Sequence, residues 1–543
     1  MTTRTRTDVL LIAGFCAFLF FYGMGQFGLI GADEPRYAQV AREMLDRHDW
    51  VTPVLGGLAW LEKPPLYYWQ AMLAYSVLGV SDVAARVPAA VDATLLVIAV
   101  YLFFRRFRRG VEVDAALITA SGAGVIGYAH AASMDMALAV AFGVGMLAWW
   151  AWRESGKRIY LVLFYFCMAL GMLAKGPVAP LLAAAVIVLF ALAVRDFRVA
   201  VRTLWLPGIL LFCAIALPWY VAVQMRNPQF FREFILQHNL ARFSSNLYHH
   251  REPFWYYLPV TAVALMPWTV FVIAAVVESV RIWWAERQAV SAEPDLELQF
   301  RVFASCWLIV PIAFFSLSQS KLPGYILPAI PAGAVLLADY LRRHLTQQQD
   351  KEPAVSKGLA MLHALVAAAP IVPAVLIAYL ATQHRLPAGR PRLVALAIAI
   401  VLAGAIALTL TSRLRLRMLR FVTLIPVVLA VAAVLKLGSN SIDQTLSARP
   451  LAVELAGMET HRLPLALYGV SREMEYGLAF YRNHAPLRYE RESVPAEEHL
   501  LVAPATWKDN VAKQTAGRRV LLLGHYTPQD VDYYWVSIAE AKH

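Results

Sequence analysis

The sequence predicts a multi-spanning α-helical membrane protein that ends in a small α/β domain. Three observations predict this fold class. Of the 543 residues, 59% are hydrophobic and only 16% are charged, whereas soluble domains carry about 25% charged residues. The mean hydropathy is +0.54. Long apolar stretches recur as far as residue 436, and residues 437–543 are much more polar.

The apolar stretches are long enough to cross a bilayer, which requires about 20 apolar residues per helix. About 13 stretches meet this requirement. They cover residues 8–28, 86–104, 112–130, 134–152, 159–174, 177–194, 204–224, 256–280, 302–318, 323–341, 359–381, 391–412 and 418–436. We therefore expect a membrane domain over residues 1–436 and a separate soluble α/β domain over residues 437–543.

Arginine and lysine residues gather in alternate loops between these stretches. The first clusters are Arg4 and Arg6, then Arg105, Arg106, Arg108 and Arg109, then Arg153, Lys157 and Arg158. Cytoplasmic loops carry this excess of positive charge, so the N-terminus is predicted to be cytoplasmic and residues 29–85 to lie outside. An odd number of spans then places the C-terminal domain outside as well. The net charge of +12 follows from this topology and from contacts with anionic membrane lipids, so no nucleic-acid partner is expected.

The loop over residues 28–80 is unusual because it gathers acidic, basic and aromatic side chains between two spans. Pro35 follows the polar Asp33, which is typical of a helix start. Apolar residues at positions 37, 40, 41 and 44 share one helix face, so we expect this helix to lie in the membrane interface. A second short interfacial helix is expected after the Lys-Pro-Pro sequence at 63–65.

The C-terminal segment reads as a small mixed domain. Residues 464–470, 499–504 and 518–526 have the pattern of strands, and residues 472–484 that of an amphipathic helix. No spacing typical of a catalytic site occurs there, so we expect a structural cap on the outer face. The four cysteines, Cys16, Cys167, Cys213 and Cys306, all fall in expected spans, so no disulfide framework is predicted.

The candidate functional residues are ionisable or tyrosine side chains at the outer ends of the expected spans. They are Asp33, Glu34, Arg36, Tyr37, Glu62, Lys63, Asp135, Lys175, Arg242, His249, His250, Arg251, Lys321 and Tyr325. A charge at the centre of a bilayer costs about 2.5 kcal/mol or more. Their placement at span ends therefore indicates a site at the outer interface and not an ion path through the membrane.

Several of these residues also have a simpler interpretation. Asp33 and Glu34 are candidate bases or positioning groups, but stabilisation of a helix N-terminus explains them equally well. The lysines are candidate phosphate ligands, and snorkelling toward the headgroups is the alternative. Glu62, His249 and His250 form a candidate set of ligands for a divalent metal such as zinc, magnesium or manganese, although adjacent histidines usually diverge. No cofactor is required by the sequence.

Several motifs taken together resemble a known enzyme family. They are the acidic pair Asp33 and Glu34, EKPPLYYW at 62–69, MDMAL at 134–138, AKGP at 174–177, LPWY at 217–220, HREPFWYYLP at 250–259 and SKLPGYILPAIPA at 320–332. As a set they resemble the glycosyltransferases that use polyprenyl- or dolichyl-phosphate sugars and have the GT-C fold. Within them, the sequence is most similar to the bacterial lipid A aminoarabinose transferases of glycosyltransferase family 83. The motifs cover residues 28–340, and the C-terminal domain contains none of them.

The resemblance implies a reaction and roles for the candidate residues. A sugar, 4-amino-4-deoxy-L-arabinose, would move from undecaprenyl phosphate to a lipid A phosphate on the periplasmic face of the bacterial inner membrane, with inversion. This modification of lipopolysaccharide gives resistance to polymyxin and cationic antimicrobial peptides. Asp33, Asp135 and Glu34 would be catalytic. The donor phosphate or lipid would be bound by Lys63, Arg36, Tyr37, Arg242, Arg251, Lys321, Tyr325 and Lys175.

Two alternatives remain at this stage. A protein O-mannosyltransferase or another cell-envelope glycosyltransferase would share the donor site and differ in the acceptor. A lipid transporter would require ionisable residues in mid-span and inverted repeats, and the sequence contains no convincing repeat. The protein is expected to act as a monomer.

Overall fold

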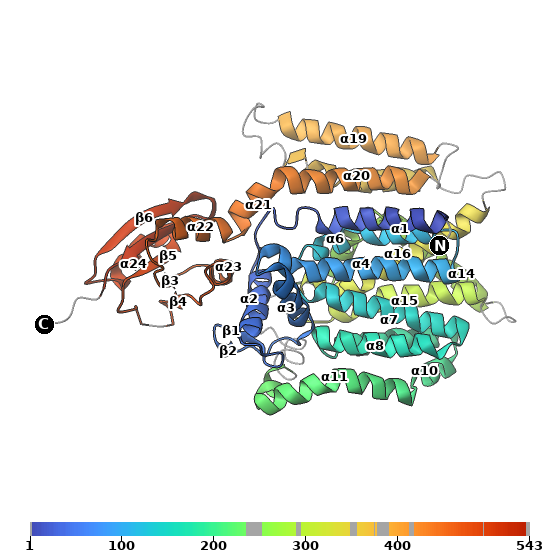
Figure 1. Ribbon diagram of the computed structural model, residues 1–543. Coiled ribbons are helices and arrows are strands. Elements are labelled where there is room, and N and C mark those ends of the chain that lie inside the picture. Colours follow the sequence, from blue (N-terminus) through green and yellow to red (C-terminus); the bar gives the residue numbers. More distant parts are fainter. Residues whose placement is uncertain are drawn as a thin grey trace.

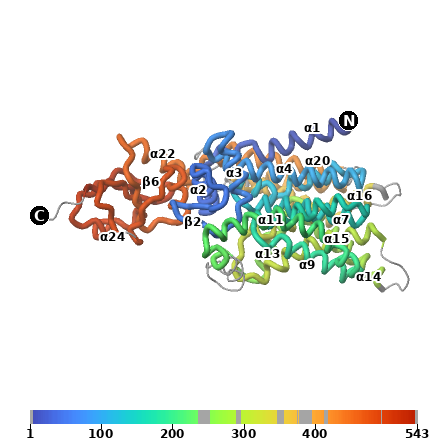
Figure 2. Tube along the Cα trace, turned by 60° about the horizontal axis from the view of Figure 1, so that its bottom comes forward, coloured from blue at the N-terminus to red at the C-terminus, as the bar shows by residue number. Residues whose placement is uncertain are grey.

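The computed structural model in Figure 1 describes residues 3–234, 252–288, 295–347, 356–373, 375–376, 390–411, 418–491 and 493–538. A bundle of long helices runs along one common direction, and a small mixed domain stands at one end of it (Figures 1 and 2). The C-terminal domain and the first loop after α1 therefore lie at the same end of the molecule.

The bundle is built from helices that fall in the stretches predicted to span the membrane. They are α1 (Thr3–Cys16) with η1 (Ala17–Phe21), α4 (Asp82–Phe107), α5 (Glu112–Ser121), α6 (Ala123–Ala129), α7 (Asp135–Ser155), α8 (Arg158–Lys175), α9 (Val178–Val194), α10 (Phe197–Thr203), α11 (Leu206–Arg226), α13 (Tyr257–Ala264), α14 (Thr269–Gln288), α15 (Leu296–Ser316), η3 (Pro323–Ala329), α16 (Ile330–Gln347), α17 (Lys357–Ala368), α19 (Arg390–Thr411), α20 (Leu419–Ala433) and η5 (Val434–Gly438).

In the described part of the chain, seven helices are long and apolar enough to cross a membrane by themselves. The pair formed by α13 and α14 qualifies as one broken span, bent by 112°. Shorter apolar helices occupy residues 178–194, 357–373 and 395–411. Each predicted span thus contains helix wherever it is described, which confirms a multi-spanning membrane protein. The number of crossings, about 13, stays a prediction.

The N-terminus lies at the end of the bundle opposite the C-terminal domain (Figure 1). Arg105, from the basic cluster after the second predicted span, donates a hydrogen bond of 3.1 Å to Thr5. The first two basic clusters therefore lie at the same end of the bundle, as the alternation of charge predicts.

The first loop contains the two short helices predicted from its sequence. Helix α2 (Asp33–Asp46) crosses the end of the bundle and is followed by a hairpin of β1 (Val54–Leu55) and β2 (Leu58–Ala59) and by α3 (Leu66–Leu78) (Figure 1). Tyr37, Val40, Ala41 and Met44 are buried on the predicted face of α2, where they pack against Tyr67 and Tyr68 of α3. The two helices therefore form one platform beneath the C-terminal domain.

The C-terminal domain contains a five-stranded mixed sheet in the order β4-β3-β5-β7-β6. The strands are β3 (Leu465–Leu467), β4 (Leu487–Arg488), β5 (His499–Pro504), β6 (Val520–Tyr526) and β7 (Val531–Val536). The helices are α22 (Arg449–Met458), α23 (Arg472–Arg482) and α24 (Lys508–Gln514). The predicted strands at 464–470, 499–504 and 518–526 each contain a strand, and the predicted helix at 472–484 is α23.

Two features of this domain differ from the sequence prediction. Strands β4 and β7 were not predicted, and β7 is an interior strand because it pairs antiparallel with both β5 and β6. The boundary expected at residue 437 falls inside a helical stretch that continues from Leu419 to Leu446 through α21 (Ser439–Leu446). The hydropathy of the sequence drops after Gly438, but the helical backbone continues through the polar residues of α21.

Candidate active site

A polar cavity of about 500 Å³ opens between the first loop, the ends of α7 and α8, η3 and helix α23 of the C-terminal domain. Nine of the residues predicted from the sequence line it: Asp33, Glu34, Arg36, Tyr37, Glu62, Lys63, Asp135, Lys175 and Tyr325. They come from segments up to about 290 residues apart in the chain, so the fold brings most of the predicted site together in one place.

The N-terminal turn of α2 contributes an ion pair to the cavity. Nη2 of Arg36 donates to Oδ1 of Asp33 at 2.5 Å. The Asp33 side chain is 51% exposed, whereas that of Arg36 is 9% exposed. Burial opposes the charge on Arg36, but the nearby Tyr37 and Asp33 outweigh it and raise the pKa of the guanidinium. Arg36 is thus a fixed cation, and Asp33 is the member of the pair that a ligand reaches first.

Glu34 also lines the cavity, but its carboxylate is used to hold the protein together. One oxygen accepts from Nη2 of Arg86 at 2.7 Å and from the Ile30 backbone at 3.1 Å, and the other accepts from the Ala132 backbone at 3.1 Å. Arg86 is fully buried and donates further bonds to the carbonyls of Met24, Phe27 and Gly28. These contacts make Glu34 a tie between α2 and the bundle. The sequence prediction did not include Arg86.

On the opposite wall, Asp135 at the start of α7 forms an ion pair with Lys175 at the end of α8. The second oxygen of Asp135 accepts a hydrogen bond from Ser133 at 3.2 Å. Nζ of Lys175 lies 4.7 Å from the centre of the Tyr325 ring, a distance typical of a cation–π contact. Lys175 is therefore held by a carboxylate and an aromatic face at the edge of the cavity, and it is not a lysine that snorkels freely.

Lys321 is placed differently from its sequence prediction as a cavity ligand. Its ammonium group is buried and donates to the carbonyls of Ser318 at 2.5 Å and Glu252 at 3.1 Å. The residues that follow it, from 322 to 325, line the cavity, but Lys321 does not. The two carbonyls satisfy the charge locally, so Lys321 fixes the loop that carries Tyr325.

Arg242, His249, His250 and Arg251 lie outside the described residues. Within the described ranges, no group of three His, Cys, Asp or Glu side chains is placed to hold a metal ion. The proposed metal ligand Glu62 does line the cavity. A divalent metal bound by Glu62, His249 and His250 therefore stays a prediction. The four cysteines are free in the structure.

Two charged residues that line the cavity were not predicted from the sequence. Arg472 and Glu473, at the start of α23, face the same space as the residues of the first loop. Their only signal in the sequence is an amphipathic helix, because the contact joins segments more than 400 residues apart. The C-terminal domain is thus part of the cavity wall and not only a cap.

A second, apolar cavity of about 750 Å³ lies along the bundle. It is bounded by α3, α4, α7 and α8 and extends from Leu66, three residues after Lys63, to Tyr160 and Arg106 at the far end. A polar cavity that neighbours a long apolar one is the arrangement expected for an amphipathic ligand with a charged head and a hydrocarbon chain.

Gly324 offers a test of how tightly the polar cavity is arranged. A Cβ atom at this position would lie 2.7 Å from Oη of Tyr128 and 2.9 Å from Cγ of Asp135. We expect Gly324→Ala to displace Asp135 and to lower activity by roughly 10- to 100-fold while the protein still folds, since small displacements of reacting groups have effects of this size. Steady-state kinetics measure the effect. Gly358→Ala, which meets no atom within 4 Å, is the matched control, and equal activity of the two variants would contradict the prediction.

The chain is similar to known membrane glycosyltransferases in sequence and in fold. Residues 8–232 match the model of the dolichyl-phosphate-mannose-protein mannosyltransferase family. The structure is similar over 97% of both chains to ArnT from Cupriavidus metallidurans bound to undecaprenyl phosphate, with a TM-score of 0.72 and 23% identity. The apo form of that protein gives a TM-score of 0.71 and 22% identity over 98% of both chains. The chain has the GT-C fold of ArnT.

The amino-acid sequence is also similar to that of known arabinosyl transferases. The undecaprenyl phosphate-alpha-4-amino-4-deoxy-L-arabinose arabinosyl transferases of Pseudomonas paraeruginosa and Pseudomonas aeruginosa are each 32% identical to the chain. The matched region covers 63% of this chain and 61% of each relative. The match therefore spans less than two thirds of the relatives' length. The resemblance indicated by the motifs of the first loop and the later outer segments is confirmed.

Proposed function

We propose that this protein is a membrane glycosyltransferase that moves 4-amino-4-deoxy-L-arabinose from undecaprenyl phosphate to a phosphate of lipid A. The observation that carries the proposal is the polar cavity, in which Lys63, Lys175 and Arg36 lie beside the acids Asp33 and Asp135. Fixed cations stabilise the negative charge of a phosphate leaving group, and the names of the relatives supply the sugar and its carrier.

The two cavities suit the two parts of the proposed donor. The apolar cavity along α3, α4, α7 and α8 would hold the first part of the prenyl chain, and its end at Leu66 brings the phosphate close to Lys63. Lys175, oriented by Asp135 and Tyr325, would contact the phosphate from the other side.

The proposed reaction is a single displacement. An oxygen of the acceptor phosphate attacks the anomeric carbon, the bond from that carbon to the donor phosphate oxygen breaks, and its electron pair leaves with undecaprenyl phosphate. The acceptor is already anionic, so it needs orientation more than removal of a proton. Asp33 would orient the acceptor or the amino group of the sugar, and Arg36 and Tyr37 support Asp33 through the contacts around α2. One displacement implies inversion.

The proposed site faces the periplasm. This orientation rests on the alternation of positive charge, which puts the N-terminal end of the bundle in the cytoplasm and the cavity end outside. The enzyme would act in the bacterial inner membrane as a monomer, with its C-terminal domain in the periplasm and a divalent metal as a candidate cofactor. The product would be modified lipopolysaccharide that resists cationic antimicrobial peptides.

A mass spectrum of lipid A tests the function directly. In a host that makes the donor but lacks its own transferase, expression of the protein should add the mass of one aminoarabinose to lipid A and raise resistance to polymyxin. Unchanged lipid A masses alongside well-folded protein in the membrane would overturn the proposal. Newly glycosylated proteins under those conditions would favour the activity named for the matched family model, transfer of a sugar to protein.

A further inference from the structure

Helix α23 projects two charged side chains of the C-terminal domain into the cavity formed mainly by the membrane domain. Arg472 and Glu473 line that cavity and are exposed, so a ligand can reach them. Tyr476, one turn further along α23, lies half-buried behind them. Helix α23 lies on the side of α2 that faces away from the bundle (Figure 1).

Tyr476 brings two guanidinium groups together. The Cζ atom of Arg36 lies 5.5 Å from the centre of the Tyr476 ring, and that of Arg472 lies 5.7 Å from the same ring. Nη2 of Arg472 also donates to the Tyr476 hydroxyl at 3.4 Å, a contact that raises the pKa of Arg472. One arginine comes from the first loop and the other from the last domain, and both guanidinium groups contact the same ring.

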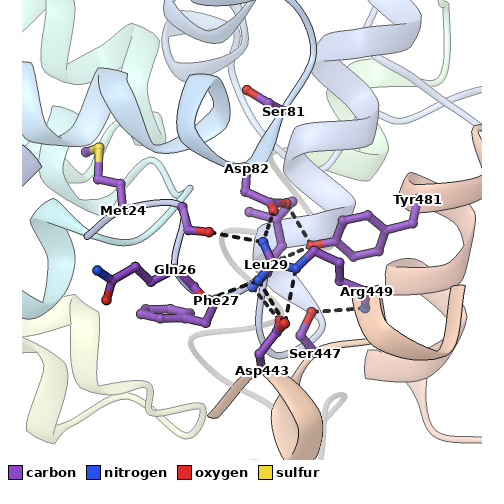
Figure 3. A network of polar contacts seen from close by, with 12 residues as sticks. Met24, Gln26, Phe27, Leu29, Ser81, Asp82, Asp443, Ser447, Arg449 and Tyr481 are labelled. Atoms are coloured by element: carbon purple, nitrogen blue, oxygen red, sulfur yellow. Dashed lines mark hydrogen bonds and ion pairs between the residues drawn. The ribbon is translucent and has the colours of Figure 1, made fainter. Parts of the chain in front are cut away.

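The position of α23 is fixed by a docking network made of Asp82, Asp443, Arg449 and Tyr481 (Figure 3). Arg449 bonds to Asp82 and to Asp443 at 2.8 Å each. The Tyr481 hydroxyl, on α23 itself, donates to Asp82 at 2.7 Å and accepts from the Leu29 backbone at 2.7 Å. The network ties α23 to the start of the first loop and to α4, so Arg472 keeps its place above the cavity.

Helix α23 and the residues just before α22 lie so close to Gly28 of the first loop that no side chain fits at this position. A Cβ atom at Gly28 would lie 2.3 Å from the Ser447 hydroxyl and 2.4 Å from the Tyr481 hydroxyl. Arg42 of α2 also donates to the carbonyl of Phe480 on α23 at 3.2 Å. The contact between the C-terminal domain and the first loop is therefore tight, and it holds the helix that carries Arg472 against the first loop.

We propose that Arg36 and Arg472, held over Tyr476, form a two-arginine clamp for the phosphate of the acceptor lipid. A guanidinium has five donors in a planar fork that matches phosphate, and the bond to Asp33 uses only part of the capacity of Arg36. Nε of Arg36 is buried without a hydrogen-bond partner among the described residues. Two like charges repel each other unless an anion lies between them, so the arrangement favours an anionic ligand.

The position of the clamp assigns it to the acceptor. The donor phosphate is attached directly to a prenyl chain, so it stays near the bundle, where Lys63 and Lys175 line the cavity. A phosphate carried on a sugar headgroup stands further from the membrane, at the level of the C-terminal domain. Glu473 and Glu62 line the same cavity, and their carboxylates would repel an anion that is not aligned with the arginines, which makes the clamp selective for position.

This inference rests on the proposed function, and binding measurements without any sugar donor test it separately. The full-length protein in phosphatidylcholine nanodiscs is titrated with phosphorylated lipid A, with dephosphorylated lipid A and with undecaprenyl phosphate. We expect Arg472→Ala to weaken binding of phosphorylated lipid A by roughly tenfold or more and to leave the other two ligands unaffected. Arg472→Lys should be intermediate, since it keeps the charge but loses the fork. Lys513→Ala, an exposed cation of α24 in the same domain, should bind as the wild type does.

Three results would overturn the clamp. The wild type could bind phosphorylated and dephosphorylated lipid A with the same affinity, or Arg472→Ala could bind phosphorylated lipid A as tightly as the wild type does. The third is that Arg472→Ala weakens the binding of undecaprenyl phosphate as much as that of phosphorylated lipid A. A wild type that binds phosphorylated lipid A through Arg472 but transfers no sugar to it would instead overturn the proposed function and leave the clamp standing. If Arg472→Ala does not purify as folded protein, Arg472→Lys decides the question through the same three titrations.

Discussion

Replacing Asp33 with asparagine should lower the rate of sugar transfer by roughly 100-fold or more, as removal of a single charged group from a reacting centre commonly does. Asparagine keeps the shape of the side chain and removes its charge. Asp33 is half exposed to the cavity and bonds Arg36 at 2.5 Å, so it is placed both to contact a ligand and to orient the arginine. The measurement is the initial rate of transfer with purified protein, donor and lipid A.

The alternative for Asp33 is a purely structural one, stabilisation of the α2 N-terminus. That effect is worth only about 0.3–1 kcal/mol at an exposed site, and it would change the thermal midpoint slightly without a large loss of rate. Asp46→Asn, at the other end of the same helix and exposed to solvent, is the matched control and should keep full activity. A folded Asp33→Asn variant with wild-type rates would show that the structural explanation is sufficient.

Local signals in the sequence were enough to predict the platform formed by α2 and α3. Proline at position 35 and the apolar spacing of residues 37–44 predicted α2, and the structure has it over Asp33–Asp46. Hydropathy predicted the bundle, because a bilayer requires long apolar helices whatever their packing. The strands of the C-terminal domain were predicted where the sequence is apolar, and β7, with the sequence VDYYWV, was missed between polar turns.

The roles of individual charges depended on partners that the sequence does not bring together. Lys175 and Lys321 look alike in sequence, each followed within two residues by glycine or proline. In the structure Lys175 reaches Asp135 at the cavity edge, whereas Lys321 is satisfied by backbone carbonyls. Glu34 looks like the twin of Asp33, but Arg86, 52 residues later, binds its carboxylate. Such choices are made by tertiary contacts, so periodicity and spacing do not reveal them.

The second large effect is expected on stability, at Arg86. Arg86→Met removes the donor of four hydrogen bonds and leaves Glu34 as a buried charge without its partner. Breaking a buried ion pair from one side costs about 3–5 kcal/mol. We expect the thermal midpoint of the detergent-purified protein to fall by several degrees, and the yield of folded protein to fall with it. Arg105→Met, at an exposed arginine on the same helix α4, should have a much smaller effect, since it removes hydrogen bonds to Thr5 and Tyr101 and leaves no buried charge without a partner.

A double variant separates the ion pair from simple loss of packing. In Arg86→Met combined with Glu34→Gln the charge at position 34 is gone, so part of the lost stability should return and the two changes should not add. If the effects add, the Arg86 side chain acts through its packing on Phe27, whose ring centre lies 4.5 Å from its Cζ atom, and the ion pair contributes little. A non-additive result would establish Glu34 as the residue that fixes α2 to the bundle. The charge that α2 presents to the cavity would then be that of Asp33, which explains why two adjacent acids at the same helix start have different roles.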